Sequence, residues 1–119
     1  MDMYEQQREL KRHWRAAAIE RRKRTSADPR REAGRLLAEH ALEASLIRPR
    51  STVAAFASMG SEISMMPLLE AMFDTDCRVL VPRLGAGMEV GWSELNGLDD
   101  LRDQRNADGS INTHRPQEP

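Results

Sequence analysis

The sequence predicts an α/β fold in which N-terminal helices precede a parallel β-α-β sheet unit. Two observations predict this order. Before Pro49 the apolar residues recur at helical spacing, whereas after it they fall into short runs that are typical of buried parallel strands. Two of these runs, residues 52–57 and 77–81, flank a segment with helical spacing, and this order is the pattern of a β-α-β unit.

Length and composition fit one small domain. The chain has 119 residues, of which 39% are hydrophobic and 4% aromatic, and its mean hydropathy is -0.66. We therefore expect a single domain over residues 1–119 with a thin core of aliphatic side chains and Met. No run approaches the roughly 18 apolar residues of a membrane span, and the N-terminus lacks the apolar stretch of a signal peptide. These absences predict a cytoplasmic protein with no membrane partner.

A first helix is predicted from about Tyr4 to Arg24, because this stretch contains many good helix formers and neither Gly nor Pro. Lys11 and Arg15, one turn apart, point the same way. Beside them runs a narrow apolar stripe that we expect to pack against the rest of the protein; it comprises Leu10, Trp14, Ala17 and Ala18. We expect Trp14 to contribute to this packing rather than to stack on a nucleic-acid base.

The second helix is predicted to open at Asp28, with Asp28 as the N-cap and Pro29 at the first helical position. It must end before Pro49, because the residue before a proline is disfavoured in helical conformation. The face that we expect to enter the core consists of Ala33, Leu36, Leu37, Ala41 and Ala44.

The β-α-β unit begins with the strand at residues 52–57, and the loop Ser58–Glu62 follows it. We expect Ser64 to cap the next helix, with Pro67 in its first turn, where a missing N–H costs little. The residues of this helix that should face inward are Leu68, Leu69, Met72 and Phe73.

The helix is expected to end near Asp74, and a second strand, Cys77–Val81, to be closed by Pro82. Residues Met88–Trp92 alternate enough to predict a third strand at an edge. After Leu101 the sequence is polar and has no period, so we expect residues 103–119 to form a loosely ordered tail.

Charge divides the chain into two unlike halves. Residues 1–50 contain 13 basic against 8 acidic side chains, whereas residues 51–119 contain 5 against 11. A basic first half suggests an anionic partner such as a phosphate or a nucleic acid. The alternative is a solvated helix face with no partner.

Two loops are expected beyond the carboxyl ends of the parallel strands, where open sheets bind ligands. They are Ser58–Glu62 and Pro82–Arg83. Glu62 would accept charge-assisted hydrogen bonds from an amine or a ring N–H, and Arg83 would suit a carboxylate or phosphate. The alternative for Glu62 is a structural role in a helix first turn, where the helix dipole favours a carboxylate.

Other motifs carry little weight. Gly85–Gly91 has the glycines of a dinucleotide loop, but such a loop opens a helix and this one precedes a strand pattern. The three His residues lack metal-ligand spacing, and Ser58 lies in no nucleophile elbow. Cys77, as the single cysteine, excludes an internal disulfide and is expected to be a small apolar residue of the sheet.

Five segments then stand in a recognisable order: the basic Lys11–Arg15, the strand and loop Phe56–Ile63, the strand end Val81–Arg83, the strand Met88–Val90 and the closing Gln117–Pro119. Together they resemble the 5-formyltetrahydrofolate cyclo-ligase (methenyltetrahydrofolate synthetase) family. The resemblance covers residues from about 8 to 119. It implies an incomplete three-layer Rossmann-like fold.

The resemblance also implies a reaction. That reaction is the ATP-dependent cyclisation of 5-formyltetrahydrofolate to 5,10-methenyltetrahydrofolate with Mg²⁺, releasing ADP and phosphate, so that catalysis is mainly positioning and charge stabilisation. By resemblance, Ala57 and Glu62 contact the folate, with Glu62 bonding the pterin N–H groups. The ATP-binding segment by the same resemblance is Lys11, Arg12, His13, Trp14 and Arg15.

Members of the family continue with a further strand and a glycine-rich Arg-Leu-Gly-x-Gly-x-Gly-Tyr-Tyr-Asp segment that wraps the ATP phosphates. This sequence lacks that segment, so we expect the N-terminal part of a longer enzyme domain, inactive at this length. Two alternatives remain open. One is a nucleic-acid-binding module that uses the Arg-rich first helix, against which the few aromatics and the acidic second half argue. The other is a non-catalytic interaction protein.

Overall fold

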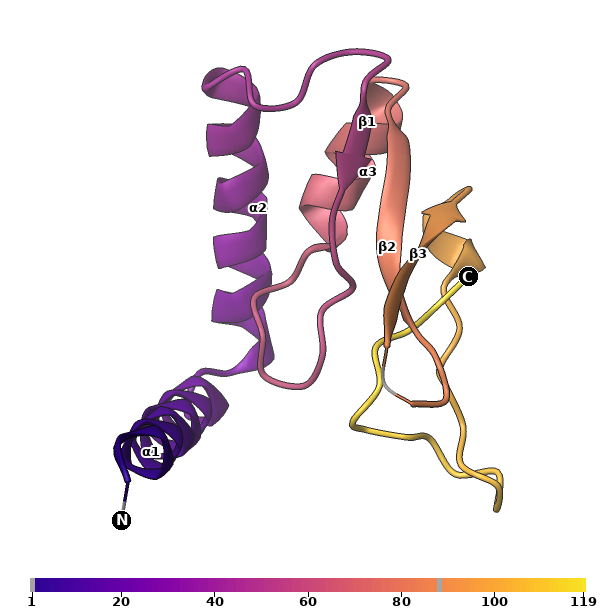
Figure 1. Cartoon of the computed structure of the whole chain (residues 1–119). Coiled ribbons are helices and arrows are strands. Elements are labelled where there is room, and N and C mark those ends of the chain that lie inside the picture. Colours follow the sequence, from indigo (N-terminus) through magenta and orange to yellow (C-terminus); the bar gives the residue numbers. More distant parts are fainter. Residues whose placement is uncertain (1, 88) are drawn as a thin grey trace.

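The computed structural model describes residues 2–87 and 89–119, which form helices and a three-stranded mixed sheet (Figure 1). The predicted α/β class is confirmed, with the helices first and the β-α-β unit after them. In chain order the elements are α1 (Met3–Lys23), α2 (Ala27–Glu43), β1 (Thr52–Ala54), α3 (Met66–Asp74), β2 (Arg78–Leu84), β3 (Val90–Leu95) and a single 3-10 turn (Leu98–Asp100).

The sheet has the order β1-β2-β3. β1 runs parallel to β2, with Ala54 beside Leu80, which confirms the predicted parallel unit. β3 is an edge strand as predicted, and it pairs antiparallel with β2, with Leu95 opposite Val79. It continues past Trp92 to Leu95, and the predicted start of this strand, Met88, lies outside the described residues.

The prediction that Pro82 closes the second strand is wrong, since β2 runs through it to Leu84. Backbone N–H groups alternate between the two sides of a strand, so the nitrogen of Pro82 faces the same side as that of Arg78. The Arg78 N–H donates to the carbonyl of Ser51 at 2.8 Å, beside β1. Because β1 ends at Ala54, Pro82 meets no strand on that side, and its missing N–H costs no ladder hydrogen bond.

The core lies where α3 packs against β2 and α2. Its most deeply buried side chains are Leu69 of α3, Val79 and Val81 of β2, and Leu95 of β3. The inward face predicted for α3 is confirmed, because Leu68, Leu69 and Met72 are buried and Phe73 packs against the same cluster.

The predicted start and inner face of α2 need correction. The helix begins at Ala27 with Ser26, not Asp28, in the N-cap position. Its buried residues are Gly34, Ala38 and Ala41, with Leu37 partly buried, whereas Ala33, Leu36 and Ala44 are exposed.

The reason for this rotated face is a close approach at Gly34. A Cβ atom built there would overlap the carbonyl oxygen of Ser64. Only a residue without a side chain lets α2 pass this close to the segment before α3. The helix therefore turns Gly34 inward, and the larger Ala33 and Leu36 remain outside.

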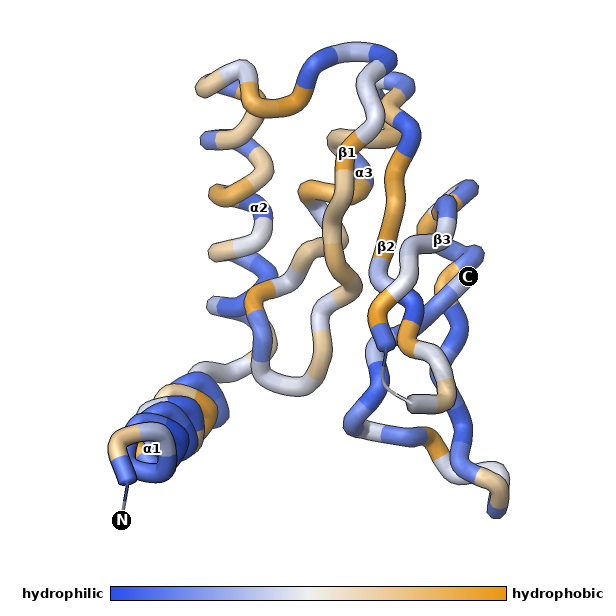
Figure 2. The backbone as a smooth tube through the Cα atoms, in the orientation of Figure 1, coloured by the Kyte–Doolittle hydropathy of each residue, from blue (hydrophilic) through white to orange (hydrophobic). Residues whose placement is uncertain are grey.

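Helix α1 forms where predicted, but its apolar stripe does not pack. None of the residues of Met3–Lys23, all of which the structure describes, is buried, and Leu10 and Trp14 are 57% and 64% exposed. The helix projects away from the remaining elements, and most of its residues are hydrophilic (Figures 1 and 2). Its ends are stabilised locally, because Asp2 accepts the Glu5 N–H at 2.8 Å and the last turn is basic.

The segment near the C-terminus contacts the end of β2. The backbones of Arg102 and Glu118 exchange two hydrogen bonds, and the buried Glu118 carboxylate accepts the N–H of Leu84 at 2.8 Å. Arg115 donates to the carbonyls of Leu84 and Gly85 at 2.9 and 3.0 Å. In the described residues, no helix combines the length and apolar composition needed to cross a bilayer.

The contact at Gly34 makes a specific prediction. Gly34→Ala should lower the free energy of unfolding by about 1–3 kcal/mol, because the added methyl group overpacks the junction of α2 with the segment before α3. Gly91→Ala is the matched control, since its Cβ would lie 3.8 Å from its nearest neighbour, the Arg83 carbonyl. Urea unfolding measures both. An unchanged midpoint for Gly34→Ala would show that α2 does not pass this close.

Candidate functional site

The loop between β1 and α3 is closed by the hydroxyl of Ser58. This hydroxyl donates to the carbonyl of Ile63 at 2.6 Å and accepts the N–H of Met65 at 2.8 Å. Ser58 therefore fixes the backbone immediately before α3, although no side chain caps this helix, a role that was predicted for Ser64. That prediction is wrong because Met65 occupies the N-cap position, while the Ser64 N–H donates to the carbonyl of Arg30 in α2 at 3.4 Å.

Glu62 folds back over its own loop. Its Oε1 accepts the N–H of Met59 at 2.8 Å, and its own N–H donates to the Met59 carbonyl at 3.0 Å. Between them, Gly60 has a φ of 52°, in the left-handed region that glycine adopts most readily. Oε2 lies 4.0 Å from Nη1 of Arg22 at the end of α1, and the side chain is 34% exposed. One carboxylate oxygen thus fixes the loop, and the other lies near the Arg22 guanidinium.

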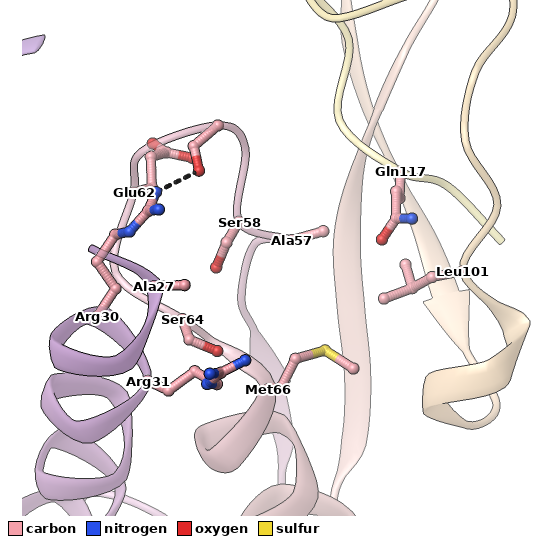
Figure 3. Close-up of a pocket in the computed structure, with 11 residues that line it drawn as sticks. Ala27, Arg30, Arg31, Ala57, Ser58, Glu62, Ser64, Met66, Leu101 and Gln117 are labelled. Atoms are coloured by element: carbon pink, nitrogen blue, oxygen red, sulfur yellow. Dashed lines mark hydrogen bonds between the residues drawn. The ribbon is translucent and has the colours of Figure 1, made fainter. Parts of the chain in front are cut away.

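A cavity of about 280 Å³ lies beside this loop (Figure 3). Five separate segments form it: the first turn of α2, the loop, the start of α3, the end of the 3-10 turn at Leu101 and the chain near its C-terminus. The lining residues are Ala27, Arg30, Arg31, Ala57, Ser58, Gly60, Glu62, Ser64, Met66, Leu101 and Gln117.

The structure brings together the two residues predicted to contact folate. Ala57, only 5% exposed, lies on the cavity wall, and Glu62 lies on the loop above it (Figure 3). Both follow β1, which ends at Ala54, so the carboxyl end of this strand carries the cavity as open α/β sheets do.

The five residues predicted to bind ATP lie elsewhere. Residues Lys11–Arg15 are all exposed on α1 and none of them lines the cavity. Lys11 instead borders a hollow on the surface of α1, together with Tyr4 and Arg8. The nearest link from α1 to the cavity is Arg22, through Glu62.

Arg83 does not join the site. It was predicted in a loop after the second strand, but it lies within β2, opposite Gly91, and is exposed. The prediction of a Pro82–Arg83 loop is wrong because antiparallel pairing with β3 carries the strand past the end of β1, and the turn comes only at Gly85.

The lining residues that were not predicted to belong to a site are Ala27, Arg30, Arg31, Ser64, Met66, Leu101 and Gln117. The sequence did contain a signal for the two arginines. Pro29 marks the start of a helix, so Arg30 and Arg31 were expected in its first turn, which is the part of α2 that borders the cavity. Nothing in the local sequence around Leu101 or Gln117 indicates that these residues return to the end of β1.

The cavity combines one carboxylate with guanidinium and hydroxyl groups. Arg31 pairs with Asp28 in its own helix, and Arg30 donates to the carbonyl of Gly60. Such a lining suits a polar ligand with N–H donors that can reach Glu62. Among the described residues, no three His, Cys, Asp or Glu side chains gather in a way that could hold a metal ion.

The comparison with protein families gives one match. The model of the 5-formyltetrahydrofolate cyclo-ligase family matches residues 7–119 of the chain. The matched region includes nearly all of α1 and every residue that lines the cavity. Among the curated proteins, none matches this sequence.

The two hydrogen bonds of the Ser58 hydroxyl, to Ile63 and Met65, predict that this hydroxyl stabilises the loop. Ser58→Ala should lower the free energy of unfolding by about 1–3 kcal/mol, because the Met65 N–H and the Ile63 carbonyl lose their partner. Ser61→Ala, in the same loop, is the control. Thermal or urea unfolding and amide exchange at Met65 measure the effect. Equal stability and exchange in the two variants would contradict the role of the Ser58 hydroxyl.

Proposed function

Since the chain belongs to the 5-formyltetrahydrofolate cyclo-ligase family, we propose that it takes part in the ATP-dependent cyclisation of 5-formyltetrahydrofolate to 5,10-methenyltetrahydrofolate, which releases ADP and phosphate. One observation carries the proposal. Ala57 and Glu62, which are five positions apart in the sequence, line the same cavity at the carboxyl end of β1. The cavity is the proposed binding site of the formyl folate.

Glu62 is the proposed anchor for the pterin ring. A pterin presents N–H donors along one edge, and an ionised carboxylate accepts them in charge-assisted hydrogen bonds. The Met59 N–H holds Oε1 in place, so little side-chain freedom is lost when a ligand binds to the carboxylate. Ala57 has a small side chain and leaves room for the ring beside the wall.

The ATP phosphates are the proposed ligand of α1. Lys11 and Arg15 lie one turn apart and are exposed, so both cations are available to phosphate oxygens. Arg12, His13 and Trp14 belong to the same segment. Because this segment lies outside the cavity, the proposal requires α1 to move toward the loop when both substrates are bound.

The chemistry asks mainly for position and charge. A phosphoryl group passes from ATP to the formyl oxygen and leaves ADP. N10 of the folate then attacks the formyl carbon and gives up its proton, and the carbon–oxygen bond to the phosphate breaks. The negative charge on the transferring group is what Lys11 and Arg15 would stabilise, and Glu62 would hold the ring in register for attack by N10.

Mg²⁺ accompanies ATP in the reaction that the family name implies. In enzymes of this kind the ion is held largely by phosphate oxygens and water. The described side chains do not form a cluster of three ligands, so they do not fit a site that the protein builds by itself. We therefore assign the ion no protein ligand and no step.

One observation favours a second function. Helix α1 exposes its basic residues along its whole length and buries no side chain, as expected for a helix that binds a nucleic-acid backbone. Binding to a polyanion of this kind would weaken steeply with added salt and would not depend on Glu62.

Glu62→Gln should weaken binding of 5-formyltetrahydrofolate by about ten- to a hundredfold while ATP binding changes little, because a charged acceptor is lost. The Gln side chain keeps an oxygen for the Met59 N–H, so the loop should stay closed. Isothermal titration of the 119-residue chain with each ligand measures the effect. Glu70→Gln, an exposed carboxylate of α3, is the control. Intact folate affinity with lowered heat stability would assign Glu62 to the structure alone.

Arg15→Ala should weaken ATP binding by about ten- to a hundredfold and leave the formyl folate unaffected, because a charged hydrogen bond to phosphate is lost. Arg21→Ala removes the same charge from a position about 120° around α1 from Arg15 and serves as the control. Titration with ATP and with a DNA duplex, each at two salt concentrations, measures both functions. Equal losses in the two variants, with tight salt-sensitive DNA binding, would favour the second function.

A further inference from the structure

Arg30 touches the loop that carries Glu62 from outside it. The side chain lies in the first turn of α2 and is partly buried. Its Nη1 donates to the carbonyl of Gly60 at 2.9 Å, and its Nε donates to the carbonyl of Ser26 at 3.3 Å (Figure 3). One guanidinium therefore ties the turn of the loop to the N-terminal end of α2.

The backbone of the same residue holds the other end of the loop. The Arg30 carbonyl accepts the N–H of Ser64 at 3.4 Å. Ser64 is also the residue whose carbonyl Gly34 approaches, four residues farther along α2. The first two turns of α2 thus contact the loop both at Gly60 and at Ser64.

The hydrogen bond from Arg30 to the Gly60 carbonyl holds the turn that sets the position of Glu62. The Met59–Glu62 turn is closed by the two hydrogen bonds between its end residues, and Gly60 lies inside it with a φ of 52°. A Cβ at Gly60 would meet nothing within 4 Å, so packing does not hold this peptide. The Arg30 guanidinium holds it by a hydrogen bond instead.

We propose that Arg30 is the positioning residue for the Glu62 carboxylate: it fixes the Gly60 peptide and thereby presents Glu62 to the formyl folate. The inference rests on the proposed function of Glu62. A guanidinium suits the task because its fork donates to two carbonyls on different segments at once, whereas an ammonium has no such planar geometry. Arg30 also lines the cavity, so amide exchange at Met59 and Glu62 is the readout that separates action through Glu62 from direct contact with the substrate; lost folate affinity with unchanged exchange would overturn the inference.

Three variants of the 119-residue chain test the inference. Arg30→Ala removes both side-chain bonds, and Arg30→Lys keeps a cation that can reach the Gly60 carbonyl. Arg35→Ala is the control, because Arg35 lies in the same helix with the same charge and forms its ion pairs with Glu32 and Glu39 of that helix. The measurements are titrations with 5-formyltetrahydrofolate and with ATP, amide exchange at Met59 and Glu62, and thermal unfolding.

Arg30→Ala should bind the formyl folate about tenfold more weakly, with unchanged ATP affinity and faster exchange at Met59 and Glu62. Arg30→Lys should recover part of the affinity, and Arg35→Ala should match the wild type. Folate affinity and exchange in Arg30→Ala equal to those in Arg35→Ala would overturn the inference. Equal losses of folate and ATP binding with a lower Tm would overturn it too, because they indicate general destabilisation.

The same experiment separates this inference from the proposed function. A wild-type chain that does not bind the formyl folate contradicts the role proposed for the cavity. In that case amide exchange decides alone whether Arg30 holds the Met59–Glu62 turn. Faster exchange in Arg30→Ala supports the clamp, and unchanged exchange rejects it.

Discussion

The arrangement of this protein depends on the hydroxyl of Ser58. By bonding to both Ile63 and Met65, it turns the chain from the end of β1 into the first turn of α3. The direction of α3 follows from that turn, and with it the burial of Leu69 against β2. The same closed loop carries Glu62 and forms one wall of the cavity, so the core and the site share a single constraint.

The sheet is covered on one face only. Val79 and Val81 of β2 are buried beneath α3, whereas Leu80, between them, faces the other way and is only partly buried. On β3, Trp92 and Val90 are 55% and 61% exposed. The cavity lies at the end of the covered part, where α2 and α3 meet the loop.

Much of the fold could be predicted because its signals are local. Proline positions and helical spacing placed the three helices, and the inner face of α3 followed from its period. The errors arise where a distant partner decides. The inner face of α2 is set by the contact of Gly34 with Ser64, and the length of β2 beyond Pro82 is set by pairing with β3.

The residues of the candidate site likewise fall into those with a local signal in the sequence and those placed by distant contacts. Glu62 could be placed at the end of the first strand because the loop Ser58–Glu62 follows it directly, whereas Ala57, inside the predicted strand, was assigned to the folate only through the family resemblance. Gln117 could not be placed there, since only the folded path of the chain brings it back to that strand end. The clamp by Arg30 likewise depends on how α2 lies against the loop, which no spacing in the sequence reports.

The contacts of the C-terminal segment with β2 protect an exposed strand edge against pairing with other chains. Where β1 stops, a strip of β2 would otherwise present unpaired backbone groups, and such strips recruit foreign strands and seed aggregates. Here Pro82 has no N–H to offer, Glu118 occupies the N–H of Leu84, and Arg115 occupies its carbonyl. The strip is therefore blocked to an incoming strand by two side chains and one imino acid, without the need for another strand to cover it.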